Sequence, residues 1–109
     1  MKLDLKELIA KLTNTPMIVG YTRNGYIRTI KWSNGLMIQS GTVALTTGSI
    51  TAITFPTAFV NNPNVVASTG AGQARGYLGV ESVSLTGFEV WKSTTSQQWI
   101  RWIAIGEWK

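Results

Sequence analysis

Residues 24–35, NGYIRTIKWSNG, decide the fold, because two Asn-Gly pairs enclose a run of β-branched and aromatic residues. Asn-Gly is a strong short-range hairpin signal, since a tight type I′ turn needs positive φ at both of its central positions. Every second residue from Tyr26 to Trp32 lies on one face of a strand, given the two-residue period of β-structure. The pattern predicts a meander of three strands, at 17–23, 26–32 and 36–45.

The chain after this meander continues as short segments separated by Gly, Pro and polar residues. Turn signals at intervals of about 8–12 residues are typical of an antiparallel sandwich or barrel. Further strands are predicted at 50–55, 64–69, 77–85, 87–92 and 98–106. We therefore predict that residues 16–109 form an all-β domain, an antiparallel β-sandwich of about six to eight strands.

The last predicted strand, 98–106, is apolar on both faces except at Arg101. A strand with one face in water alternates apolar and polar residues, whereas a strand buried on both sides does not. One face is expected in the core, and the other lies either against a second subunit or under a loop or the N-terminal helix. The residues predicted to form the core are Phe55, Phe59, Val65, Phe88, Ile103 and Ile105.

Residues 3–12 carry the only helical pattern, with apolar side chains spaced i, i+3, i+4 and i+7. These side chains are Leu5, Leu8, Ile9 and Leu12. Pro16 and the preceding Asn14 stop the helix, and a helix this short is marginal alone in water. Residues 1–15 are therefore expected to form a short helical segment. It either docks on its own domain or forms a parallel bundle with other copies.

Composition argues against catalysis. The chain of 109 residues has no Cys and no His, which removes thiolate chemistry, the commonest general base and the commonest metal ligand. Its five carboxylates are scattered, and no Gly-rich phosphate loop is present. We expect a protein that is not an enzyme and holds no cofactor and no metal.

The charge is mildly basic, with ten Lys and Arg against five acidic residues and a net charge of +5. The cations never form a cluster in the sequence, so they favour anionic partners without identifying one. The charge-interleaved start does not read as a secretion signal, and no apolar run approaches the roughly 20 residues of a membrane span. We expect synthesis in a cytoplasm without a cleaved leader.

Three segments, in order, resemble the C-terminal tip domain of phage tail fibres. They are IKWSNGLMIQSG at 30–41, FPTAFVNNPNVVA at 55–67, and the pair GFEV at 87–90 and WIAIG at 102–106. The chain departs from this pattern at Ser40, where fibre tips often carry an aromatic residue. The same pattern is similar to the H-type lectins, small trimeric sandwiches that bind sugars.

The resemblance implies a homotrimer that recognises a cell-surface glycan. For a fibre tip the implied role is host attachment: a virion protein whose partners are a bacterial surface polysaccharide, its own copies and other tail-fibre or baseplate proteins. A structural assembly module that binds nothing remains an alternative.

Two loops combine the flat rings and polar groups that sugar binding needs. They are 70–77 and the polar stretch between Trp91 and Trp99. Either loop could equally be a plain connection. The candidate glycan-binding residues are Gln73, Arg75, Tyr77, Trp91, Gln97 and Gln98. The candidate trimer-interface residues are Leu5, Leu8, Ile9, Leu12, Trp99, Trp102 and Trp108.

A single-stranded nucleic-acid-binding barrel is the less favoured alternative. It needs aromatic side chains that stack on bases along a groove lined by Lys and Arg. Only the strand face that carries Tyr26 and Arg28 combines both, and it is a single strand.

Overall fold

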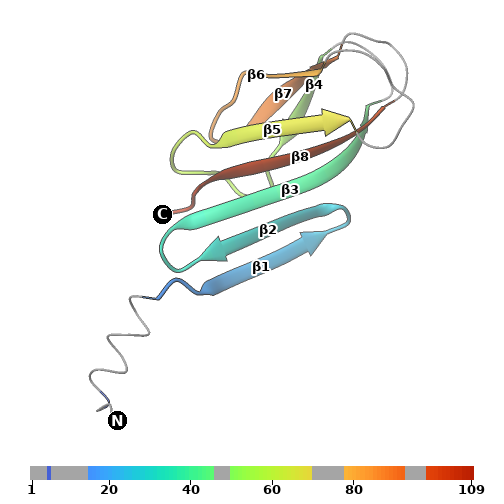
Figure 1. Cartoon of the computed structure of the whole chain (residues 1–109). Coiled ribbons are helices and arrows are strands. Elements are labelled where there is room, and N and C mark those ends of the chain that lie inside the picture. Colours follow the sequence, from blue (N-terminus) through green and yellow to red (C-terminus); the bar gives the residue numbers. More distant parts are fainter. Residues whose placement is uncertain (1–4, 6–14, 46–49, 70–77, 93–97) are drawn as a thin grey trace.

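The computed structural model describes residue 5 and residues 15–45, 50–69, 78–92 and 98–109 (Figure 1). Its strands are β1 (Ile18–Asn24), β2 (Ile27–Trp32), β3 (Leu36–Leu45), β4 (Ile50–Thr54), β5 (Asn64–Thr69), β6 (Leu78–Glu81), β7 (Gly87–Lys92) and β8 (Gln98–Glu107). They fall close to the predicted segments, so the all-β expectation is confirmed. The helix expected at 3–12 lies outside the described residues except for Leu5, and the boundary at residue 15 stays a prediction.

The strands form two antiparallel sheets. The larger has the order β1-β2-β3-β8-β5, and the smaller has the order β4-β7-β6. The longest ladder joins β3 to β8, from Leu36 opposite Glu107 to Leu45 opposite Gln98. In Figure 1 the five-stranded sheet lies in front of the three-stranded sheet. The apolar core lies between the two sheets, so the predicted sandwich is confirmed.

Both Asn-Gly pairs lie at hairpins, but the predicted type I′ turns are wrong. Asn24 is the last residue of β1, so the central residues of the first turn are Gly25 and Tyr26. Of these two, only Gly25 has a positive φ, 63°, which is the type II′ pattern with Gly first. The second turn uses three residues, 33–35, and Gly35 alone has a positive φ, 99°. In each pair the glycine supplies the left-handed backbone.

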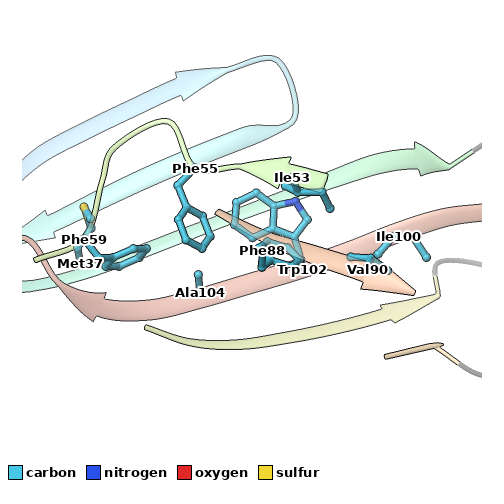
Figure 2. Packing of buried hydrophobic residues seen from close by; sticks show 9 residues of the cluster. All are labelled: Met37, Ile53, Phe55, Phe59, Phe88, Val90, Ile100, Trp102 and Ala104. Carbon is cyan, nitrogen blue, oxygen red and sulfur yellow. The ribbon is translucent and has the colours of Figure 1, made fainter. Parts of the chain in front are cut away.

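Strand β8 alternates between the two faces of its sheet, and this corrects part of the predicted core. Ile100, Trp102 and Ala104 point into the core (Figure 2). Ile103 is only half-buried and Ile105 is exposed. Neither of them belongs to the core cluster, because the two-residue period places them on the opposite face. The sequence showed that both faces of β8 are apolar, but only packing against the core between the two sheets shows which face is covered.

Aromatic rings from both sheets and from the loop after β4 fill the core. The centroids of Phe55 and Phe59 are 5.0 Å apart, and those of Phe88 and Trp102 are 5.4 Å apart. Phe55, Phe59 and Phe88 are confirmed as core residues, while Val65 is half-buried against the cluster. The buried apolar residues are Met37, Ile53, Phe55, Phe59, Phe88, Val90, Ile100, Trp102 and Ala104 (Figure 2).

A buried amide fastens the loop after β4 to the five-stranded sheet. The Gln39 side chain is fully buried, and its Oε1 accepts hydrogen bonds from the Thr29 hydroxyl and the Thr57 backbone N–H, both at 3.1 Å. Its Nε2 donates to the Thr57 carbonyl at 2.8 Å. These bonds satisfy the polar groups that the core would otherwise leave without partners. They hold the loop over β2 and β3.

Candidate functional site

The face of the five-stranded sheet that points away from the core is called here the outer face. On it, Arg23 of β1 lies opposite Arg28 of β2, which lies opposite Ser40 of β3. Two residues along β3, Thr42 lies opposite Arg101 of β8. The register therefore brings arginines from three strands to the end of the outer face nearest the β1–β2 turn.

These arginines line a hollow of about 400 Å³, which we call the arginine hollow. Ser40 and Thr42 contribute to its floor between the arginine-bearing strands, and Tyr26 contributes to its rim. Its side-chain lining includes Arg23, Tyr26, Arg28, Ser40, Thr42 and Arg101. Guanidinium and hydroxyl groups together offer many hydrogen-bond donors within a small volume.

The positive charge of the arginine hollow is not neutralised by any carboxylate in the described part of the chain. Arg23 Nε donates to the Gly25 carbonyl at 3.2 Å, and none of the arginines in the hollow forms an ion pair there. The described carboxylates lie elsewhere. Glu81 and Glu89 lie on the three-stranded sheet, and Glu107 accepts a hydrogen bond from an amide in the loop before β5. The hollow is therefore a local concentration of cations.

An exposed aromatic pair borders the arginine hollow. The rings of Tyr26 and Trp99 meet edge to face, with centroids 6.4 Å apart and an angle of 77° between their planes. Tyr26 is 70% exposed and Trp99 is 49% exposed. Arg101 follows Trp99 by two residues, so both side chains lie on the outer face of β8. Exposed rings beside cations can stack on flat apolar faces of a ligand.

Much of the rest of the outer face is apolar, although Asn64, Ser68 and Glu107 also lie on it. One row crosses the sheet in register from Tyr21 through Ile30 and Ile38 to Ile105. Beside this row, Ile103 lies opposite Val66, which is 64% exposed. We call this set, Tyr21, Ile30, Ile38, Val66, Ile103 and Ile105, the apolar band. An exposed apolar surface spread over several strands is typical of a face that another chain covers.

Most of the predicted glycan-binding residues lie outside the described residues or without a described side chain. Four of them lie outside the described residues: Gln73, Arg75, Tyr77 and Gln97. Gln98 is described only as the first backbone position of β8. Trp91 is half-buried on β7, opposite Ile50 and Gly79. These residues stay a prediction.

The predicted trimer-interface residues occupy different environments. Leu8, Ile9 and Leu12 lie outside the described residues, and Leu5 is exposed. Trp102 is 4% exposed in the core of its own chain, which leaves it little surface for a partner. Trp108 is half-buried, and its indole N–H donates to the Trp32 carbonyl at 2.8 Å. Trp99 has the most exposed side chain of the three tryptophans.

The arginine hollow was not predicted from the sequence. The sequence pattern placed Arg28 and Tyr26 on one strand face but did not join Arg23 and Arg101 to them. The predicted turn, with Asn24 and Gly25 at its centre, would have paired Arg23 with Tyr26, so the sequence could place Arg23 and Arg28 on one face but not opposite each other. Arg101 could not be placed with them, because it reaches the site only through the pairing of β3 with β8.

Two negative findings concern the described residues alone. They contain no group of three or more acidic, His or Cys residues that could hold a metal ion. They also contain no helix long and apolar enough to cross a membrane.

Residues 31–107 match the family model of the gp53-like tail fiber protein C-terminal domain. No curated protein sequence matches the chain. The N-truncated R1-type pyocin tail fiber has a similar structure, with a TM-score of 0.70 and 21% identity over 96% of this chain and 98% of that one.

Two structures of R2 pyocin tail fibers share the same fold. One, from P. aeruginosa, has a TM-score of 0.71 and 16% identity, and the other has a TM-score of 0.72 and 18% identity. Each match covers 97% of this chain, but only 30% and 44% of the respective fibre structures. The chain thus spans less than half of these two fibre structures.

Proposed function

Because the chain belongs to the family of gp53-like tail fiber C-terminal domains, we propose that it forms the tip of a phage or prophage tail fibre and attaches the particle to a bacterial surface polysaccharide. Family membership confirms the expected kinship with tail fibres, and a place in a phage or pyocin particle is part of the proposal. Receptor binding, the glycan and the trimer belong to the proposal.

The observation that carries the proposal is the meeting of arginines, hydroxyls and exposed rings on the outer face. Sugar rings present apolar C–H faces that stack on aromatic side chains, and hydroxyls that need fixed hydrogen-bond partners. Tyr26 and Trp99 supply the rings, while Arg28 and Ser40 supply the polar groups. The predicted loop residues around Arg75 and Trp91 remain a second candidate surface.

The proposal includes a homotrimeric state of the protein. The apolar band supports this proposal, because β8 presents Ile103 and Ile105 on the face away from its own core. The apolar stripe of residues 3–12 is the other proposed contact, while Trp99, which the sequence placed at the interface, is assigned here to the glycan site. Three sites on one particle would bind a repeating polysaccharide with an avidity that a single weak site lacks. Other tail-fibre or baseplate proteins are further proposed partners.

The role we propose is binding and assembly rather than catalysis. The full sequence has no Cys and no His, which removes the cysteine nucleophile and the commonest general base, and its five carboxylates are scattered. A module that only organises the fibre and binds no glycan is the second candidate, and the apolar band alone would suit that role.

Two measurements test the proposal. Light scattering behind a sizing column should give about three times the chain mass of 11.9 kDa, and a monomer would refute the trimer. An array of bacterial surface polysaccharides should then retain the trimer. Failure to bind any of them, with the trimer intact, would favour the assembly module. Arg75→Ala and Trp91→Ala should lose binding while both variants stay folded if the loop residues form the site.

A further inference from the structure

We propose that the arginine hollow recognises an acidic group, phosphate or carboxylate, carried by the glycan. This inference rests on the proposed function and specifies its ligand. It assigns the charge to Arg23, Arg28 and Arg101, and the sugar ring to the aromatic pair formed by Tyr26 and Trp99.

Arginine side chains from three strands converge on the hollow. Side chains directly opposite each other in an antiparallel pair have Cβ atoms about 4.5–5.5 Å apart, so Arg23 and Arg28 start side by side. Arg101 extends from β8, the strand beyond β3, into the same hollow. Guanidinium groups present paired N–H donors that match the oxygen atoms of phosphate or carboxylate. Such a group placed between the three arginines could accept hydrogen bonds from more than one strand.

The positive charge of the hollow is uncompensated within the described residues. Like charges directly opposite in a sheet are destabilising, and Arg23 and Arg28 occupy such positions. Within the described residues no carboxylate pairs with either of them or with Arg101. A bound anion would offset this repulsion and could accept hydrogen bonds from guanidinium groups on more than one strand. A neutral sugar would leave the repulsion in place.

Hydroxyl groups of β3 also line the hollow. Ser40 and Thr42 place hydroxyl groups between the arginine-bearing strands, and both lie on the outer face of β3. A hydroxyl can donate to an anionic oxygen atom or accept from a sugar hydroxyl. The hollow therefore offers donors on its floor as well as its walls, while the Tyr26–Trp99 pair offers an apolar surface at the rim.

The geometry favours a local acidic group over a polynucleotide. Proteins that bind single strands track several phosphates along a basic groove. Here the arginines gather at one end of the outer face, and the neighbouring rows are the apolar band. A volume of about 400 Å³ suits one sugar ring with its acidic substituent.

The test uses three probes that differ in charge: glucose 6-phosphate, glucuronate and glucose. Each is titrated into the full ¹⁵N-labelled chain at low salt, and amide shifts give the affinity and the location of binding. We expect at least one charged probe to bind ten-fold or more tightly than glucose and to shift the amides of Arg28, Ser40 and Thr42. The comparison of phosphate with carboxylate identifies the acidic group. Added salt should weaken binding.

Three variants of equal charge change provide the matched comparison. Arg28→Gln and Arg101→Gln should each lower the affinity for the charged probe about ten-fold or more, because each removes a charge-assisted hydrogen bond. Lys109→Gln loses the same unit of charge at the end of the sheet near the β2–β3 turn, and it should bind like the parent protein. Arg28 and Arg101 are both exposed, and a preserved amide spectrum verifies the fold.

Several results would overturn the inference. Equal affinity for glucose and the charged probes would do so, as would unchanged binding by Arg28→Gln and Arg101→Gln. Tighter binding of a thymidine oligonucleotide, with a steep salt dependence, would assign the hollow to nucleic acid instead. The proposed function and the arginine site can be distinguished by polysaccharide binding. If the parent protein and both variants bind the same polysaccharide equally, the tip role stands and only the arginine site is wrong.

Discussion

Replacement of Gln39 by leucine tests how the fold is held at its most buried polar point. The Gln39 amide makes three hydrogen bonds, one with the Thr29 hydroxyl and two with the backbone of Thr57. Leucine has a similar volume but no polar atoms, so the substitution removes the bonds while the core stays filled. The substitution leaves the Thr29 hydroxyl and the Thr57 N–H without their acceptor and the Thr57 carbonyl without its donor.

The magnitude follows from the burial of those partners. A buried polar group that loses its partner costs about 1–3 kcal/mol. The Thr29 hydroxyl is buried, and Thr57 is half-buried, so water replaces its bonds only in part. The expected loss for Gln39→Leu is about 3–5 kcal/mol. That is a large share of the roughly 5–15 kcal/mol that stabilises a typical domain.

Urea unfolding followed by tryptophan fluorescence measures this loss, at one fixed protomer concentration because assembly would shift the midpoint. Thr29→Val removes a single bond and should cost only about 1 kcal/mol. Thr57→Ala is the matched control, since both bonds to Thr57 use its backbone, and it should change the midpoint little. A Gln39→Leu variant within 1 kcal/mol of the parent, or no less stable than Thr57→Ala, would refute the reasoning.

Three further substitutions have expected effects on stability. In Gly41→Ala the new Cβ would lie 2.8 Å from Trp102 Nε1, so overpacking should cost about 1–3 kcal/mol and lower the Tm. Gly25→Ala meets no atom within 4 Å, but its φ of 63° should cost about 1–2 kcal/mol, and a Tm equal to the parent's would contradict this. Trp108→Phe loses the hydrogen bond to the Trp32 carbonyl and should cost about 1 kcal/mol in urea unfolding.

Strand positions could be predicted from the sequence because local signals fix them. The glycines of the two Asn-Gly pairs mark the ends of β2, and alternation marks the strands between turns. The prediction of core residues was wrong on β8, where both faces of the strand carry apolar side chains. Ile103 and Ile105 therefore could not be distinguished from Ile100 and Ala104 until the covering elements were known.

The candidate site was harder to predict because it depends on non-local pairing. Arg23 and Arg28 are close in sequence, and their hairpin brings them opposite each other. Arg101 joins them through the ladder between β3 and β8, which sequence spacing does not reveal. The sequence prediction looked instead to loops rich in flexible and polar residues, which is where binding groups are often found.

The apolar band and the arginine hollow share the outer face, and in the proposed trimer this would couple assembly to ligand affinity. Ile103 of the band lies directly opposite Ser40 of the hollow, so a second copy that covered the band would also exclude water beside the arginines. The attraction between two charges is about four-fold stronger at an effective dielectric constant of 20 than in bulk water. An acidic glycan would therefore be held more tightly by assembled copies than by one chain. The avidity of three sites would add to this local effect.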